Sequence, residues 1–266
     1  MEQPLAGRTV VITRAASQAD DFANALENYG AKVVICPTIE ITEPESYARI
    51  DDALDHVYGY DWVIFTSANA VKYFLRRLAF HKREVSDLDQ LQVCAIGDKT
   101  SSKLVESNVH VDLVPSSSRG EGVFAALSDF VGGSEQLRGL NFLLPRAAVA
   151  RDYLPQALEA VGARVDVAPI YRTVIPEGVD RGRLAAVLAG SADCIAFTSS
   201  STVRNLGVLF DTCDLSVVLK GLTIACIGDV TTATATGYGL RVDIQPTDFS
   251  TSELAKAIAD YYSTNN

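Results

Sequence analysis

The chain contains two copies of one α/β sequence pattern. Residues 7–41 match residues 139–173 at an offset of 132, and Asp61–Ser67 returns as Asp193–Ser199 at the same offset. Leu91–Asp98 returns as Leu222–Asp229 at an offset of 131, so the second copy has lost one residue. Two copies are too few for a solenoid, which needs at least three stacked repeats. The duplication predicts two similar lobes, with the ligand expected in the cleft between them.

Short apolar runs alternate with helical periodicity in both copies. Thr9–Thr13 and Lys32–Cys36 are predicted strands around a helix at Ala19–Tyr29, and Gly30 has the position of a helix C′ glycine. This alternation predicts two flavodoxin-like lobes, each a parallel sheet with helices on both faces. The other predicted elements are strands at 142–144, 165–168, 62–65, 194–197, 93–96, 224–227, 109–114 and 240–244, a helix at 153–161, and final helices after possible capping boxes at Ser118–Glu121 and Ser250–Glu253.

Two proline-flanked segments, near 36–46 and 168–178, occupy equivalent positions in the copies and are expected to cross between the lobes. If each copy formed one lobe, a single crossing would suffice. Two crossings predict exchanged, discontinuous connectivity, although simple tandem lobes stay an alternative. We expect residues 1–37 and 173–266 to form one domain and residues 38–172 to form the other.

Composition argues against several classes of function. The net charge of −10 argues against a nucleic-acid partner, because phosphate binding needs a basic surface. We expect neither a membrane span nor a signal peptide, and five cysteines without a C-x-x-C pair indicate free thiols in the cytoplasm. His56, His81 and His110 lack metal-ligand spacing, and nucleotide-binding glycine motifs are missing. We therefore expect no metal and no cofactor, and a monomer that binds a small molecule.

Hydroxyl side chains follow the predicted strands in both copies, just before helices. Ligands of open parallel sheets lie beyond the carboxyl ends of the strands, where helix N-termini can bind anions. Ser and Thr also serve as ordinary N-caps, but their doubled array favours an acidic ligand. Arg14 and Arg146 are the best local cations, with an ion pair as the alternative role. The hydroxyl-rich segments are Thr66–Asn69, Gly97–Thr100, Ser116–Arg119, Thr198–Ser201, Gly228–Thr232 and Thr247–Thr251.

The copies differ at Tyr171, which matches Ile39 of the first copy. A symmetric scaffold that acts on an asymmetric substrate needs such a difference. A phenol with an ordinary pKa near 10 stays protonated at neutral pH, so Tyr171 could donate a proton. The alternative is a partly buried strand aromatic with its hydroxyl in water.

A set of short segments is spread over nearly the whole chain: Val11–Arg14 with Gly30 and Pro37, Phe65–Ser67, Ala95–Gly97, Pro169–Thr173, Phe197–Ser199, and Cys226–Gly228 with Thr231. In their order, spacing and duplication these segments resemble the uroporphyrinogen-III synthase family. The resemblance implies the bilobal exchanged fold and a cofactor-free lyase of tetrapyrrole biosynthesis. It implies a linear substrate, hydroxymethylbilane, with eight carboxylates, which loses its terminal hydroxyl and closes with inversion of ring D, through a spiro intermediate, to uroporphyrinogen III.

The resemblance also implies roles for single residues. Tyr171 matches the family's tyrosine that assists loss of the hydroxyl. The positions that match substrate-binding loops, several acting through backbone amides, are Thr66, Ser67, Thr100, Thr198, Ser199 and Thr231. The alternative function is a non-catalytic bilobal sensor or carrier of a small anion, and a flavin or nucleotide enzyme is a weaker third interpretation.

Overall fold

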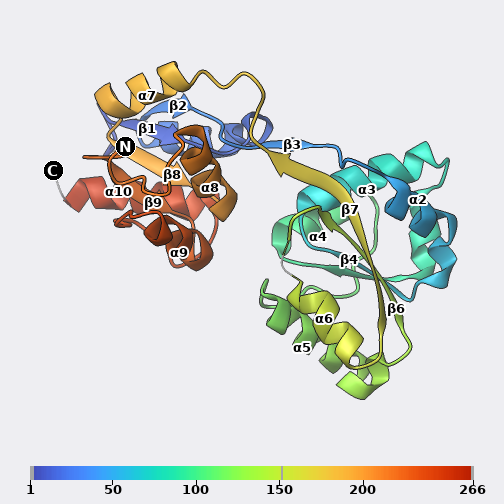
Figure 1. The fold of residues 1–266 in the computed structure, drawn as a ribbon. Coiled ribbons are helices and arrows are strands. Elements are labelled where there is room, and N and C mark those ends of the chain that lie inside the picture. The colour runs from blue at the N-terminus through green and yellow to red at the C-terminus, as the bar shows by residue number, and fades with distance from the viewer. Residues whose placement is uncertain (1–2, 151, 265–266) are drawn as a thin grey trace. The chain divides into compact units, whose positions relative to one another are not determined.

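The computed structural model describes residues 3–150 and 152–264, so the signal-peptide prediction falls partly on residues outside this range. The chain divides into two compact units. The first unit combines the described residues up to Ile41 with those from Val174 onward, and Thr42–Thr173 form the second (Figure 1).

Each unit contains strands from both copies of the repeat. In the first unit, β1 (Thr9–Ile12) pairs in parallel with β8 (Cys194–Phe197). In the second, β4 (Trp62–Phe65) pairs in parallel with β6 (Asn141–Ala147). The first strand–helix–strand segment of each copy thus joins the last part of the other copy. The predicted exchanged connectivity is confirmed.

The first unit is a parallel sheet, in the order β2-β1-β8-β9, between two layers of helices. Alternate residues of β1 face opposite sides: Val10 and Ile12 pack with α1 and α10, whereas Val11 packs with α7, α8 and α9. Burial on both faces explains why β1 is apolar from Val10 to Ile12. The remaining elements of this unit are α1 (Asp20–Asn28), β2 (Lys32–Ile35), α7 (Arg181–Gly190), α8 (Ser200–Leu209), β9 (Thr223–Cys226), α9 (Asp229–Gly237), α10 (Thr251–Thr264) and a 3₁₀ turn at Ala16–Gln18.

The second unit has a sheet in the order β3-β7-β6-β4-β5. Helices α5 and α6 lie side by side (Figure 1) and cover one face, where they pack against Ile64, Phe142 and Leu144. Helix α3 packs on the sheet through Phe74, whose ring forms a T-shaped pair with that of Phe65, with centroids 5.1 Å apart. The remaining elements are β3 (Glu40–Thr42), α2 (Ala48–Asp55), α3 (Ala68–Phe80), β5 (Gln92–Ala95), α4 (Asp98–Glu106), α5 (Gly120–Val131), α6 (Tyr153–Ala160), β7 (Arg164–Val174) and 3₁₀ turns at Val57–Gly59, Val85–Gln90 and Ser134–Leu137.

Strand β7 corrects the prediction that Pro169 ends a strand. It continues through Pro169 to Val174 and lies between β6 and β3, the latter an element not predicted from the sequence. Pro169 lies opposite Arg146, next to a register shift between Arg146 and Ala147 on β6. A proline is tolerated within a sheet at such an irregularity, because its missing N–H breaks no regular ladder bond there. The longer strand carries Tyr171 within the sheet.

The predicted strands at 109–114 and 240–244 are only single bridges, from Leu113 to Cys94 and from Ile244 to Ala225. In both copies an aspartate side chain takes over part of the pairing. Asp112 Oδ2 accepts the N–H of Val93 at 2.7 Å, and Asp243 Oδ2 accepts that of Ile224 at 3.0 Å. A side chain that bonds to backbone in this way competes with a regular ladder.

The two predicted capping boxes behave differently. Ser250 Oγ accepts the Glu253 N–H at 3.2 Å, as an N-cap does. Ser118 does not cap α5, because the helix begins at Gly120 and its N-cap is Arg119, without a side-chain cap bond. The late start of α5 moves the serine outside the capping position.

Candidate functional site

The predicted site residues of the second unit lie at one edge of its sheet, because β7, β6, β4 and β5 run parallel. Thr66 and Ser67 follow β4, and Thr100 lies in the first turn of α4, after β5. Arg146 lies near the end of β6, and Tyr171 lies in β7 opposite Ala147. The carboxyl ends of four strands therefore present these residues together.

The Tyr171 side chain is buried and contacts two neighbouring side chains. It is 8% exposed, and its hydroxyl lies 3.1 Å from Ser67 Oγ. Its ring stacks on that of Tyr73 from α3, with centroids 5.8 Å apart and an interplanar angle of 27°. Because β6 lies between β7 and β4, the Tyr171 side chain reaches over a neighbouring strand to Ser67.

Burial raises the pKa of Tyr171 above its ordinary value, because the charged phenolate loses contact with water. The hydrogen bond with Ser67 acts in the opposite direction on this pKa. The phenol is therefore protonated at neutral pH, as a general acid must be before it acts.

Thr100 and Thr231 occupy equivalent positions in the two units. Both side chains are buried, and their backbone amides donate to Gly97 O at 3.1 Å and Gly228 O at 3.0 Å. These two amides already have partners in the first turns of α4 and α9. A contribution of either threonine to ligand binding would therefore be indirect, through the shape of its helix start.

Arg146 is buried and forms an ion pair and hydrogen bond with Asp152, the residue before α6. This is the alternative role considered for this arginine. The pair ties the end of β6 to the start of α6.

In the first unit, Arg14 follows β1, Thr198 and Ser199 follow β8, and Thr231 follows β9, three neighbouring strands of one sheet. Ser199 caps α8 as Ser67 caps α3: its Oγ accepts the Thr202 N–H at 3.4 Å. The first unit therefore repeats the hydroxyl arrangement of the second, but Ile39 occupies the position that corresponds to Tyr171.

Arg14 is half-buried, and its Nε atom is buried without a hydrogen-bond partner among residues 3–150 and 152–264. Burial lowers its pKa, and the nearby Asp21 carboxylate opposes that shift. A guanidinium stays charged despite such shifts. The Nε atom of Arg172 is buried in the same way, so this feature is not specific to Arg14.

Tyr73 is a site residue that we did not predict from the sequence. Its repeat counterpart is Asn205, whose Nδ2 donates to Thr38 O at 2.8 Å. Both side chains thus reach from a helix to the crossing segment, one through ring stacking and the other through a hydrogen bond. The difference between Tyr73 and Asn205 was available from aligning the two copies and is as marked as that between Tyr171 and Ile39.

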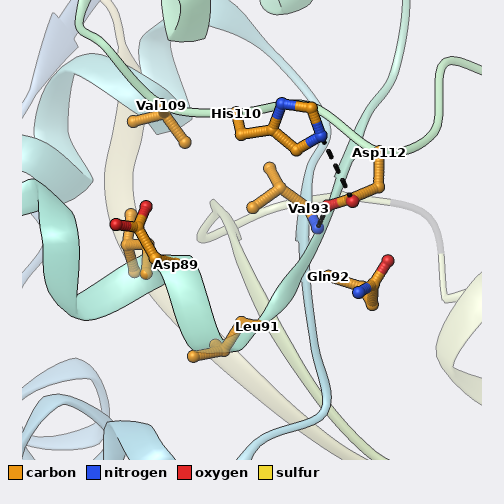
Figure 2. A pocket seen from close by; sticks show the side chains of 8 residues that line it. Asp89, Leu91, Gln92, Val93, Val109, His110 and Asp112 are labelled. Carbon is orange, nitrogen blue, oxygen red and sulfur yellow. Dashed lines mark hydrogen bonds and ion pairs between the residues drawn. The ribbon is translucent and has the colours of Figure 1, made fainter.

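The second unit also has a cavity of about 250 Å³, and Figure 2 shows the residues that line it. It is lined by Leu91 and Val93 at the amino end of β5, whereas Thr100 follows the carboxyl end of this strand. His110 Nε2 lies 3.5 Å from Asp112 Oδ1 in this cavity. A cavity of about 450 Å³ occupies the equivalent place at β9. Neither cavity contains a predicted site residue.

The part of the chain that the structure describes offers no cluster of metal ligands. Within it, three or more His, Cys, Asp and Glu side chains nowhere gather as such ligands would. In that same part, every helix is too short or too polar to cross a membrane.

Comparison with known proteins identifies relatives over nearly the full chain. The uroporphyrinogen-III synthase HemD family matches residues 20–256. The uroporphyrinogen-III synthase of Synechococcus elongatus is 33% identical, with 98% of this chain and 97% of that protein covered. That of Chlorobaculum parvum is 30% identical, with coverages of 95% and 98%.

Solved structures agree on the fold. A mutant uroporphyrinogen III synthase from Thermus thermophilus superposes with a TM-score of 0.64 at 17% identity, covering 97% of this chain and 100% of that one. The enzyme from Helicobacter pylori gives 0.62 at 18% identity, with coverages of 96% and 99%. At these identities the likeness shows the two-domain α/β fold alone.

Proposed function

We propose how this chain, which belongs to the uroporphyrinogen-III synthase family, carries out its reaction. The protein is a lyase of porphyrin biosynthesis that cyclises hydroxymethylbilane. The observation that carries the mechanistic proposal is the buried, hydrogen-bonded phenol of Tyr171 at the carboxyl edge of the sheet. Family membership favours the enzyme over the binding-protein and flavin alternatives.

Binding of the polycarboxylate substrate rests on local groups. A chain with a net charge of −10 does not attract an anion over long distances. The half-buried guanidinium of Arg14 and the N-termini of α3 and α8, capped by Ser67 and Ser199, are suited to carboxylates at short range. We assign Thr66 and Thr198, at the same strand ends, to the substrate as well. Thr100 and Thr231 shape their loops, and Arg146 holds its loop through Asp152.

Tyr171 acts as the general acid that starts the reaction. As the terminal C–O bond breaks, the Tyr171 Oη proton passes to the departing hydroxyl, which leaves as water, and a pyrrole nitrogen lone pair compensates the electron loss at carbon. The resulting azafulvene-type cation is attacked by the substituted carbon of ring D, and the spiro intermediate fragments and recloses with this ring inverted. Ring closure releases one proton, which restores the phenol. Positioning of the reactive cation supplies the rest of the catalysis.

We also propose that the protein acts as a cytoplasmic monomer without a cofactor. The two domains, with boundaries near residues 37 and 172, follow from the position of the proline-flanked crossings in the repeat.

The test is Tyr171→Phe in a coupled assay that supplies hydroxymethylbilane and resolves isomers I and III. We expect kcat to fall about 100-fold, the low end for a positioned proton donor, because the cation also forms spontaneously. Substrate affinity should change little. Ile39→Val, at the repeat counterpart, should keep the wild-type rate.

Two results would count against the proposal. A folded Tyr171→Phe protein with wild-type turnover would remove Tyr171 as the acid. A wild-type protein that binds hydroxymethylbilane but yields only the spontaneous isomer I would favour the non-catalytic carrier.

A further inference from the structure

The Tyr171 hydroxyl is the end of a hydrogen-bonded chain that starts at a helix N-terminus. The Ala70 N–H, in the first turn of α3, donates to Ser67 Oγ at 3.1 Å. Ser67 Oγ in turn lies 3.1 Å from Tyr171 Oη, and either oxygen could donate in this contact. The direction of this second bond decides what Tyr171 can do.

Only one direction is compatible with an acid. If Tyr171 donated to Ser67, its single proton would point at Ser67 and would not reach a substrate hydroxyl. If Ser67 donates, the Tyr171 proton is available to the leaving group. Ser67 Oγ can accept from Ala70 and donate to Tyr171 at the same time, because a hydroxyl has one proton and two acceptor lone pairs.

We propose that Ser67 is a positioning residue that donates its hydroxyl proton to Tyr171 Oη and links the phenol to the N-terminus of α3. This inference rests on the proposed role of Tyr171 and reassigns Ser67, which the sequence placed among groups that bind the substrate. When Tyr171 gives up its proton, the negative charge that forms on Oη is shared with the Ser67 O–H. The Ala70 N–H and the positive end of the α3 dipole stabilise that charge further.

The repeat separates this role from ordinary helix capping. Ser199 caps α8 in the same way that Ser67 caps α3. The counterpart of Tyr171 in that unit is Ile39, which offers no hydroxyl to bond. Capping is therefore common to both copies, whereas the link to a phenol exists in the second unit alone among the described residues.

Tyr73 supports the same arrangement from the side. Its ring, also on α3, stacks on Tyr171 and limits rotation of the phenol away from Ser67. Helix α3 thus contributes the serine, the amide and the stacking ring.

The experiment uses substitutions that separate capping from donation. Ser67→Asp keeps a good N-cap but cannot donate, because an ionised carboxylate only accepts. Ser67→Thr keeps both functions. We expect Ser67→Asp to remain folded and to lower kcat about 10- to 100-fold. Its KM should also rise, because the new carboxylate repels the substrate carboxylates at this helix N-terminus. Ser67→Thr should recover at least half of the wild-type rate. Asp180→Ala, which removes the side-chain cap of α7 far from these residues in sequence, is the control for cap loss and should leave kcat unchanged.

A double substitution decides whether Ser67 acts through Tyr171. On the Tyr171→Phe background, Ser67→Ala should cause no further loss of kcat, because the acceptor of its bond is already missing. Additive losses, or a loss confined to KM, would instead make Ser67 a direct substrate ligand and overturn the inference. A wild-type kcat in Ser67→Asp, together with a reduced kcat in Tyr171→Phe, would overturn the role of Ser67 and leave Tyr171 as the acid. Wild-type kcat in Tyr171→Phe would remove the acid itself.

Discussion

Gly207 in α8 provides a sharp test of how closely the first unit is packed. A Cβ added there would meet the Tyr238 ring and would lie 2.8 Å from the backbone oxygen of Thr212. The Thr212 N–H also donates to Gly207 O at 2.9 Å, so this backbone cannot easily move away. We therefore expect Gly207→Ala to destabilise the protein, although alanine favours a helix.

The sizes of two opposing energies decide whether Gly207→Ala stabilises or destabilises the protein. Replacing glycine by alanine inside a helix gains about 1 kcal/mol from helix propensity. Overpacking a filled site costs about 1–3 kcal/mol. Because the obstacle includes backbone, we take the upper part of that range and expect a net loss of about 1–2 kcal/mol in the free energy of unfolding.

Gly237 at the end of α9 is the matched control. A Cβ there would meet nothing within 4 Å. Gly237→Ala should therefore be neutral or stabilise by up to about 1 kcal/mol. Urea unfolding of both variants, followed by far-UV circular dichroism, measures the difference. A Gly207→Ala protein as stable as wild type would show that the packing around α8 yields to an added methyl group.

Two further predictions concern thiols and acid stability. Cys213 is exposed and should react with a thiol reagent in the native protein. Burial raises the pKa of the Cys94 and Cys226 thiols to about 12, so these two should react only after unfolding. Fast reaction of all thiols in the native protein would contradict this. Hydrogen bonds from Arg77 and His81 lower the pKa of Asp51 in the folded protein. The Asp51 carboxylate therefore stabilises the fold fully above its unfolded-state pKa of about 3.9. This stabilisation is lost as the pH falls through the lower folded-state pKa. Asp51→Asn should therefore be less stable than wild type at pH 7, with the difference in urea midpoint disappearing in strong acid, and a difference that persists there would disprove this assignment.

Much of the fold was predictable because the duplication is visible in the sequence. The exchanged pairing followed from two equivalent crossings, and the structure bears it out in the pairing of β1 with β8. The course of β7 through Pro169 was not predictable, because it depends on an irregularity in the neighbouring strand β6. Local sequence marks proline as a breaker and contains no information about the partner strand.

The site was predictable only in part. Tyr171 and Ser67 were identified separately, but their contact depends on a side chain reaching over β6. Tyr73 was missed because its half-buried helical position looks ordinary until the strand beside it is known. The partner of Arg146 was also missed, since the loop between Arg146 and Asp152 has no periodicity from which its path could be read.

The exchanged connectivity has a consequence for how the chain is made. The Thr9 N–H is bonded to Asp193 Oδ2, 184 residues further along. At roughly 5–20 residues per second, a ribosome needs roughly 10–40 s to synthesise that interval. The second unit is one continuous segment and can fold while β1 and β2 still lack β8 beside them. For that time β1 has an open hydrogen-bonding edge, the kind of surface that promotes aggregation. Nascent chains halted before residue 193 should accordingly depend on chaperones more than the completed protein does.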